Sequence, residues 1–269
     1  MKDLQQLYPT PGPATLRGLY LREPLLPRDW DNGIFVYSNF VISIDGRIAT
    51  EDSSTNASGV PKAIANPRDW RLFQELAAQS DVLLTNGSHL RRLKNPRVKS
   101  VLPLSAKPEF QDLHDWRMAR GLASQPDVAV LSARLDFELP AVLLQQQRRI
   151  YVFTPSTDRA AVAGLRRAGA TVIEYAPETI AGGMVGWLEQ AGYRRLYSVA
   201  GPRVLNSLLE DDVVDALFLT TVHRIIGGDS ARTLHHGALQ APADFVLRSL
   251  YLDVTNDPQQ TLARYDRRR

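Results

Sequence analysis

The stretch 38-SNFVISIDGRIA-49 decides the fold. Its first half belongs to a run of β-branched and aromatic residues over 34–44, and such a run favours a buried strand. Asp45-Gly46 ends this run, and the dipeptide is typical of a turn. We therefore predict that a sheet begins with a strand over residues 34–44, followed directly by a tight turn.

Further apolar runs follow along the chain and alternate with helical patterns. We predict strands over residues 81–85, 128–131, 150–153, 171–175, 196–200 and 214–222, and helices over residues 157–168, 179–191 and 202–210. Another helix is expected to open at Asn66-Pro67, where a capping side chain precedes a proline at the first helical position. Strands that alternate with helices indicate βαβ units. The predicted fold class is therefore α/β, with a mostly parallel central sheet flanked by helices.

No change in composition of the kind that marks a linker divides the 269 residues. We expect a proline-rich N-terminal extension over residues 1–33, a single domain over residues 34–250 and a C-terminal tail over residues 251–269. Residues 91–126 show no clear periodicity, which predicts a long loop, either functional or disordered.

The composition excludes several classes of protein. Hydrophobic residues make up 44% of the chain and charged residues 23%, as in ordinary globular proteins. The absence of cysteine rules out disulfides, thiolate metal sites and cysteine nucleophiles. Residues 1–18 lack the apolar stretch of a signal peptide, and no apolar run is long enough to span a bilayer. We therefore expect a cytoplasmic protein with no membrane partner.

The net charge of +3 is spread along the chain, and its densest run is residues 267–269. We interpret this run as a solvated tail and expect no nucleic-acid partner. A mild excess of Lys and Arg suits an anionic small molecule equally well.

Familiar catalytic patterns do not occur in the sequence. None of the five histidines has metal-ligand spacing with another histidine or a carboxylate, so no metal site is expected. A G-x-S-x-G elbow and a P-loop are also missing. Once these patterns are excluded, the remaining kind of chemistry is one that a bound cofactor supplies.

Two glycine corners are candidates for binding such a cofactor. Gly201-Pro202-Arg203 follows the strand predicted over 196–200, and Gly87-Ser88 follows the strand predicted over 81–85. A strand, a glycine turn and a helix N-terminus together present free backbone N–H groups to a phosphate. The G-x-G-x-x-G fingerprint is missing, which disfavours an ordinary Rossmann site.

The stretch over residues 38–49 resembles the opening strand of the pyrimidine reductases of riboflavin biosynthesis, which are dihydrofolate-reductase-like enzymes. Three further blocks follow in the order of that family: residues 70–89, residues 200–206, and residues 214–228. Together the blocks cover residues 34–237.

The resemblance implies a single NADPH-dependent reductase domain, usually a homodimer. Its substrate would be the phosphorylated pyrimidine 5-amino-6-(5-phosphoribosylamino)uracil, or its deaminated precursor, whose ribosyl group becomes ribityl. By position, the cofactor would contact Val41, Gly87, Ser88, His89, Ala200, Gly201, Pro202, Arg203 and Val204. Asn39 and Asp45 would face the substrate, with Asp45 as the catalytic candidate and a simple turn residue as its alternative.

The chain departs from the family pattern at three places. Val199 stands where the family usually has Glu, and His89 stands where it commonly has Thr. In the family a loop binds the substrate phosphate, and residues 95–97 of this chain resemble that loop only weakly. Arg97, or else Lys99, would bind the phosphate here. Because a lost polar contact changes which substrate a pocket prefers, two alternatives stay open. One is a reductase of another pterin-like or carbonyl compound, and the other is a nucleotide-binding protein without turnover.

Overall fold

The computed structural model describes residues 3–27, 30, 33–52, 57–59, 62–94, 102, 104–176, 180–228, 232–235 and 237–269. For residues 49–52, 57–59 and 232 it describes the backbone alone.

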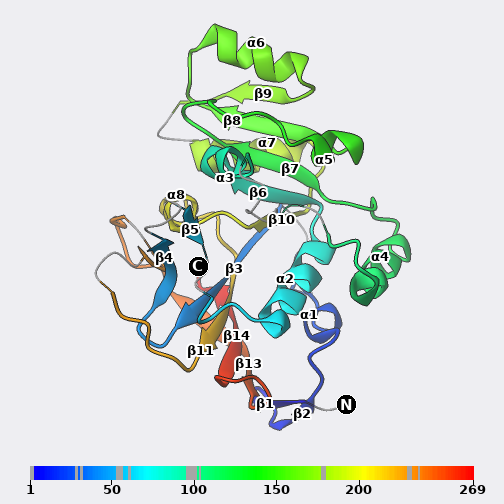
Figure 1. The fold of residues 1–269 in the computed structure, drawn as a ribbon, viewed down its shortest axis with the longest axis vertical. Helices are drawn as coiled ribbons and strands as arrows, with labels where there is room; N and C mark the ends of the chain where they lie inside the picture. Colours follow the sequence, from blue (N-terminus) through cyan, green and yellow to red (C-terminus); the bar gives the residue numbers. More distant parts are fainter. Residues whose placement is uncertain are drawn as a thin grey trace.

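A sheet of 11 strands runs through the molecule in the order β2-β1-β13-β14-β11-β3-β10-β6-β7-β8-β9 (Figure 1). Its parallel part consists of β11 (Ala216–Val222), β3 (Phe35–Ser43), β10 (Arg195–Ser198), β6 (Val82–Asn86), β7 (Asp127–Leu131), β8 (Ile150–Thr154) and β9 (Thr171–Glu174). Each of these strands overlaps a strand predicted from an apolar run. The predicted α/β fold with a mostly parallel central sheet is confirmed.

The antiparallel part of the sheet was not foreseen. It consists of β14 (Gln260–Arg267), β13 (Phe245–Asp253), β1 (Leu4–Tyr8) and β2 (Gly12–Ala14). The interpretation of residues 251–269 as a tail was wrong, because β14 lies hydrogen-bonded between β11 and β13 and buries Leu262 completely. The basic residues at its end are also paired: Arg267 lies 3.1 Å from Asp212 and Arg269 lies 2.7 Å from Asp215.

Residues 1–33 likewise belong to the body of the fold as far as they are described. Strand β1 pairs with β13, and the short helix α1 (Leu19–Arg22) contacts the long helix α2 (Pro67–Gln79). Leu16, Leu19 and Tyr20 lie in the same buried cluster as Phe218 of β11. The expected boundary at residue 33 is therefore no boundary of the hydrophobic core.

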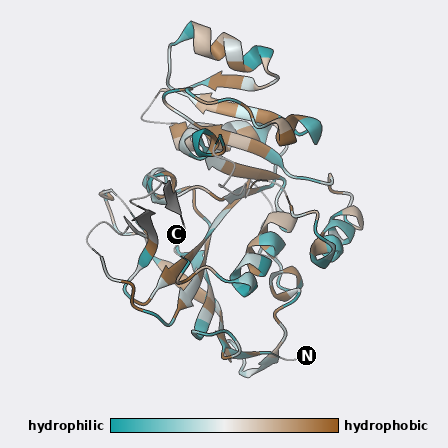
Figure 2. Ribbon diagram, in the orientation of Figure 1, coloured by the Kyte–Doolittle hydropathy of each residue, from teal (hydrophilic) through white to brown (hydrophobic). Residues whose placement is uncertain are grey.

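Helices cover both faces of the sheet. Helices α1, α2, α4 (Gln111–Met118), α5 (Ala141–Gln145) and α6 (Arg159–Arg167) pack on one face, and α7 (Ile180–Gln190) and α8 (Pro202–Glu210) pack on the other. In Figure 2, β7 and β8 are largely brown and α4 and α6 carry teal residues, as expected of strands sandwiched between amphipathic helices. Among the described residues, no helix is both long and apolar enough to cross a bilayer.

Part of the expected loop over residues 91–126 is ordered structure. It contains the last turn of α3 (Gly87–Arg92), a 3-10 turn (Pro108–Phe110) and α4. Arg117 of α4 is 1% exposed and donates to the carbonyls of Ala78 and Ser80, at 2.8 and 2.7 Å. The segment therefore clamps the C-terminal end of α2, a role that local periodicity cannot reveal.

The start of α2 confirms the prediction made at Asn66-Pro67. The side chain of Asn66 accepts hydrogen bonds from the backbone N–H groups of Arg68 and Asp69, at 3.1 and 2.9 Å. This cap fixes the first turn of α2 above the sheet.

A small second sheet lies beyond the end of β3. It joins β4 (Arg47–Asp52), β5 (Ala57–Gly59) and β12 (Arg232–Thr233) in the order β12-β4-β5.

Candidate functional site

The chain leaves two neighbouring parallel strands in opposite directions at one point of the sheet. Strands β6 and β10 are hydrogen-bonded neighbours, with Leu84 opposite Ser198. From β6 the chain enters α3 and continues to β7, whereas from β10 it enters α8 and continues to β11 on the other side of β3 (Figure 1). Ligands of open α/β sheets bind at such a switch point, outside the carboxyl ends of the strands.

The N-terminus of α8 forms one side of this point. Gly201 is its N-cap residue with φ −80° and ψ −173°, an extended conformation that any residue adopts. A Cβ added there would meet no heavy atom within 4 Å. Neither strain nor packing within the described part of the chain explains a glycine here, whereas the close approach of a ligand does.

The same corner offers unpaired donors. The backbone N–H groups of Ala200, Gly201 and Arg203 donate to no other described residue. Together with the positive end of the α8 dipole they suit an anion such as a pyrophosphate. The side chain of Arg203 is exposed and that of Val204 packs toward the core. The groups that this corner offers to a ligand are therefore those of the backbone.

The second corner, at α3, is built differently. Asn86 caps α3 by accepting from the N–H of His89 at 2.9 Å. A Cβ on Gly87 would collide with the hydroxyl of Ser132, which directly follows β7, so this glycine is required by packing. Ser88 is exposed.

The His89 imidazole is the unusual group of this corner. Its Nε2 atom is buried and has no hydrogen-bond partner among the described residues. Burial, and then the nearby Arg92 guanidinium, lowers the pKa of His89 to about 4, so the ring is neutral at physiological pH. A neutral, unpaired ring nitrogen can hydrogen-bond a ligand.

Asn39, predicted to face the substrate, and Val41, predicted to contact the cofactor, lie on the face of the sheet that α2 covers. Asn39 of β3 is half-buried, and its Oδ1 accepts a hydrogen bond from the phenol of Tyr197 on β10. Val41 is 7% exposed and packs with Ile64 and Val222. Asn39 comes one residue after Ser38, which pairs with the last residue of β10, and Val41 lies opposite Thr220 of β11.

Asp45 anchors a loop. Its carboxylate accepts from the hydroxyl of Ser43 and from the backbone N–H groups of Ile226 and Gly227, at 3.2 and 2.8 Å. The hydrogen bond from Ser43, supported by those from the backbone, lowers the pKa of Asp45 from 3.8 to about 2. The carboxylate is therefore ionised at physiological pH. It already accepts hydrogen bonds from Ser43 in the turn and from the backbone of Ile226 and Gly227.

Arg97 and Lys99, the candidate ligands for substrate phosphate, lie outside the described residues. Val199 is described: it is half-buried and packs against apolar side chains.

The sequence reasoning missed Asp69 and Thr220. Asp69 lies in the first turn of α2, where acidic residues are common in any helix, so its position gave no signal. Thr220 lies within an apolar strand and is 4% exposed. Only the packing of α2 on β11 reveals that the two side chains meet.

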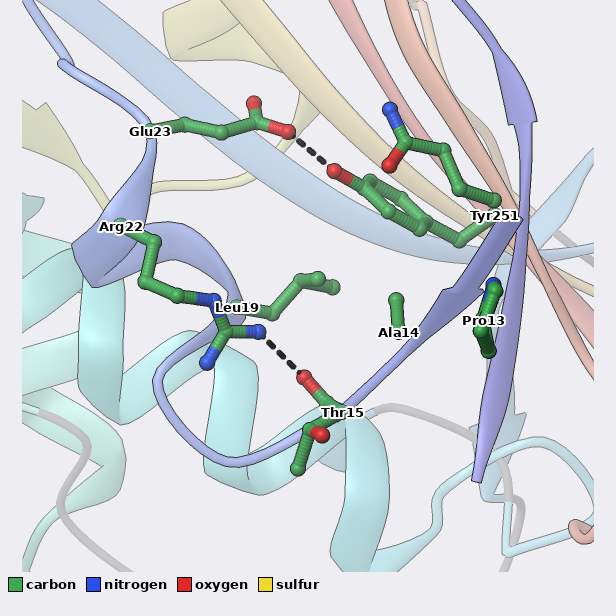
Figure 3. Close-up of a pocket in the computed structure, with 8 residues that line it drawn as sticks. Pro13, Ala14, Thr15, Leu19, Arg22, Glu23 and Tyr251 are labelled. Carbon is green, nitrogen blue, oxygen red and sulfur yellow. Dashed lines mark hydrogen bonds between the residues drawn. The ribbon is translucent and has the colours of Figure 1, made fainter. Parts of the chain in front are cut away.

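A hollow of about 530 Å³ lies far from these strand ends, between β1, β2, α1 and β13 (Figure 3). Its polar groups are already paired: Glu23 accepts from the phenol of Tyr251, and Arg22 donates to the carbonyl of Thr15 at 2.6 Å. The two charged groups that line the hollow, Arg22 and Glu23, are thus both paired with described residues.

The chain is similar to known proteins both in a family match and in its fold. Residues 34–254 match the family described as the RibD C-terminal domain. No curated protein matches the chain in sequence.

Several solved structures share the fold at low sequence identity. A pyrimidine reductase-like protein from Corynebacterium diphtheriae superposes with a TM-score of 0.72 at 17% identity, covering 95% of this chain and 100% of that one. RibD from Acinetobacter baumannii gives 0.64 at 16% identity, covering 88% of this chain and 59% of that one. The riboflavin biosynthesis reductase Rib7 from Saccharomyces cerevisiae gives 0.53 at 11% identity, covering 88% and 90%. The chain thus spans about three fifths of the RibD protein's length.

Proposed function

The chain belongs to the RibD C-terminal domain family, and from that premise we propose that it is an NADPH-dependent reductase of riboflavin biosynthesis. Its reaction converts the ribosyl group of 5-amino-6-(5-phosphoribosylamino)uracil, or of the deaminated precursor, into ribityl. One hydride and one proton are added, and NADPH leaves as NADP⁺.

The observation that carries this proposal is the open corner at Gly201. An unstrained glycine with empty space around it and free N–H groups on either side fits a pyrophosphate, and it lies at the switch point of the sheet. Ala200, Gly201, Pro202, Arg203 and Val204 would hold the pyrophosphate of the cofactor. Gly87, Ser88 and His89 would contact it from the neighbouring strand.

NADPH, when bound, supplies the hydride; the protein supplies proximity and orientation. Val41 would form an apolar wall along the nicotinamide. Asn39 would contact the substrate, and Arg97 would bind its phosphate. We propose that Asp45 acts as a positioning residue, since its carboxylate fixes the 226–228 segment to the end of β3.

We also propose that the enzyme works as a cytoplasmic homodimer. The support is the resemblance to the riboflavin-pathway reductases, which are usually dimers. Light scattering of the purified protein at several concentrations tests the dimer.

The reaction is tested by following the absorbance of reduced nicotinamide while the purified protein acts on the ribosylaminopyrimidine phosphate. NADPH and NADH are titrated in parallel. Turnover with NADPH is the expected result, and binding of neither nucleotide would overturn the proposal.

Val199 favours a second candidate function. Its apolar side chain lies among other apolar groups beside β3 and β6, where a glutamate would have offered a hydrogen bond. A reductase acting on another pterin-like or carbonyl compound would bind NADPH tightly, oxidise it slowly with the ribosylaminopyrimidine and oxidise it quickly with the other compound.

A further inference from the structure

The antiparallel part of the main sheet buries polar side chains on the face beneath α1 and α2. Four polar residues of β13 and β14 are nearly or completely buried there: Ser249, Asp253, Gln260 and Arg264. Arg264 donates to the carbonyls of Pro24 and Leu25, both at 2.8 Å. An antiparallel sheet with one face in water normally buries its apolar side chains and exposes its polar ones. The reverse arrangement here directs attention to the other face.

The other face, called the outer face below, carries no charged side chain over four strands. Residues directly opposite each other on neighbouring strands point to the same side of a sheet. The pairing of β1, β13, β14 and β11 therefore groups Gln5, Tyr8, Leu250, Leu252, Thr261, Ala263, Leu219 and Thr221, and a further row adds Leu247 and Tyr265. The three leucines of β13 are half-buried, and Tyr8 is 44% exposed.

No helix within the described ranges covers the outer face. The buried cluster beneath α7 and α8 takes its strand residues from the parallel part of the sheet and contains none from β1, β13 or β14. Leu250 and Leu252 belong to none of the hydrophobic clusters formed by the described residues. In Figure 1, β13 and β14 lie at the end of the molecule away from α7. The outer face is therefore open in a single chain.

The border of the outer face holds paired charges of both signs. Arg267 lies 3.1 Å from Asp212, and its guanidinium lies 5.6 Å from the ring centroid of Phe245. An apolar centre with a polar border is the ordinary composition of a protein interface.

The size of the outer face also fits an interface. Four strands about 4.8 Å apart, with β13 nine residues long at about 3.3 Å per residue, give a face of roughly 600 Å² in plan. Stable interfaces bury about 800 Å² of accessible surface on each partner, which is of the same order.

We propose that two copies of the chain associate through their outer faces about a two-fold axis. The two faces stack about 10 Å apart, so that the leucines of β13 interdigitate with side chains of the other copy. The occupant is a second copy because a flat face without charge offers a different partner no charge to match, whereas it is complementary to itself.

This inference rests on the homodimer proposed above and adds where that dimer forms. Strands β1 and β14 lie outside residues 34–254, which match the family, so the outer face depends on segments beyond that match.

The first test compares Leu250→Lys with the matched control Val246→Lys. Both residues belong to β13, but Val246 lies opposite Asp266 on the other side of the sheet and is 50% exposed. Sedimentation velocity should show a wild-type dimer at micromolar concentration. Leu250→Lys brings two like charges into a symmetric interface and should raise the dimer Kd at least about hundredfold. Val246→Lys should leave that Kd unchanged.

A single thiol tests the outer face directly, because the chain contains no cysteine. Thr261→Cys places the thiol on the outer face, and Val246→Cys places it on the other side. A maleimide should label Thr261→Cys at least about tenfold more slowly in a concentrated, dimeric solution than after dilution to monomers. Val246→Cys should be labelled at the same rate in both solutions. This measurement decides the question even if Leu250→Lys does not fold.

Three results would contradict the inference. An unchanged dimer Kd in Leu250→Lys with an unprotected thiol at Thr261→Cys would place the dimer contact elsewhere. A monomeric wild type with a freely reactive thiol would leave the outer face to a different partner. A monomer with a protected thiol would mean that the chain itself covers the face.

NADPH binding and oxidation by the same samples separate this inference from the reductase assignment. Turnover by a monomeric protein would keep the reductase and remove the interface. A dimer that dissociates in Leu250→Lys but binds no NADPH would keep the interface and remove the reductase.

Discussion

Gly201 and Gly87 show at the scale of single residues that two glycines after neighbouring strands have different causes. Around Gly201 the protein leaves space, whereas at Gly87 the hydroxyl of Ser132 occupies the place of a side chain. The sequence predicted both corners correctly as glycine turns between a strand and a helix. It could not separate them, because the distinguishing neighbour, Ser132, directly follows β7, more than forty residues further along.

This contrast predicts opposite effects of two substitutions. Gly201→Val should raise the Kd for NADPH at least about tenfold and leave stability nearly unchanged, because its side chain enters only the ligand space. Gly87→Ala should cost about 1–3 kcal/mol of unfolding free energy by overpacking. Nucleotide titration and urea unfolding of both variants check this; equal losses of stability would contradict it.

Asp69 predicts a dependence of stability on pH. Its pKa is raised from 3.8 to about 6, so the folded state binds this proton more tightly than the unfolded state does. Its destabilising effect is therefore absent below about pH 4, grows as the pH rises and is complete above about pH 6. Asp69→Asn should gain roughly 3 kcal/mol over the wild type near neutral pH and little near pH 4. Urea unfolding at both pH values measures the difference.

At the scale of elements, some strands of the fold can be predicted from local sequence and others cannot. The parallel strands are buried on both faces and therefore appear as continuous apolar runs. Strand β13 instead alternates between half-buried and exposed residues over its first half, and its partner β1 is recognised only through long-range pairing. For that reason residues 251–269 resembled a tail.

The clamp between α4 and α2 gives a prediction at this scale. Arg117 donates to three carbonyls, those of Ala78, Ser80 and Ala123, and burial lowers its pKa only to about 10, so it stays charged. Arg117→Met would leave these carbonyls without their donor. We expect a loss of about 3 kcal/mol in unfolding free energy by urea titration, with unchanged NADPH affinity in the folded fraction. A loss below about 1 kcal/mol would contradict the clamp.

The site shows the same limit of sequence reasoning. Asn39, Val41 and the Gly201 corner follow from local patterns and the family resemblance. Two of the three hydrogen-bond partners of Asp45, in contrast, are backbone groups 181 and 182 residues away, and Asp69 meets Thr220 only through packing. Local sequence identifies side chains that can react; tertiary contacts determine which of them are left unpaired.

At the scale of the molecule, the N-terminal segment over residues 3–27 completes the hydrophobic core. Leu4, Leu16, Leu19, Tyr20 and Leu25 are each less than 8% exposed. Buried Glu75 of α2 accepts from the N–H groups of Gly18 and Tyr20, at 2.5 and 3.1 Å. Removing the segment would expose this apolar face and leave Glu75 with fewer donors.

We therefore predict that deletion of residues 1–27 yields a protein that aggregates or binds a hydrophobic dye, although the family match begins at residue 34. Size-exclusion chromatography and near-UV circular dichroism check this result. A monodisperse deletion variant with wild-type NADPH affinity would contradict it.

The strand order also determines when the molecule can fold during its synthesis. Strand β3 is made early, but both of its neighbours, β10 and β11, lie within residues 195–222, and β1 waits for β13 at residues 245–253. Residues 195–222 must therefore be synthesised before β3 finds its neighbours, and β1 pairs only with the short strand β2 until β13 is made; until then the remaining edges are unpaired. Slow folding and dependence on chaperones in the cell follow from this order of synthesis.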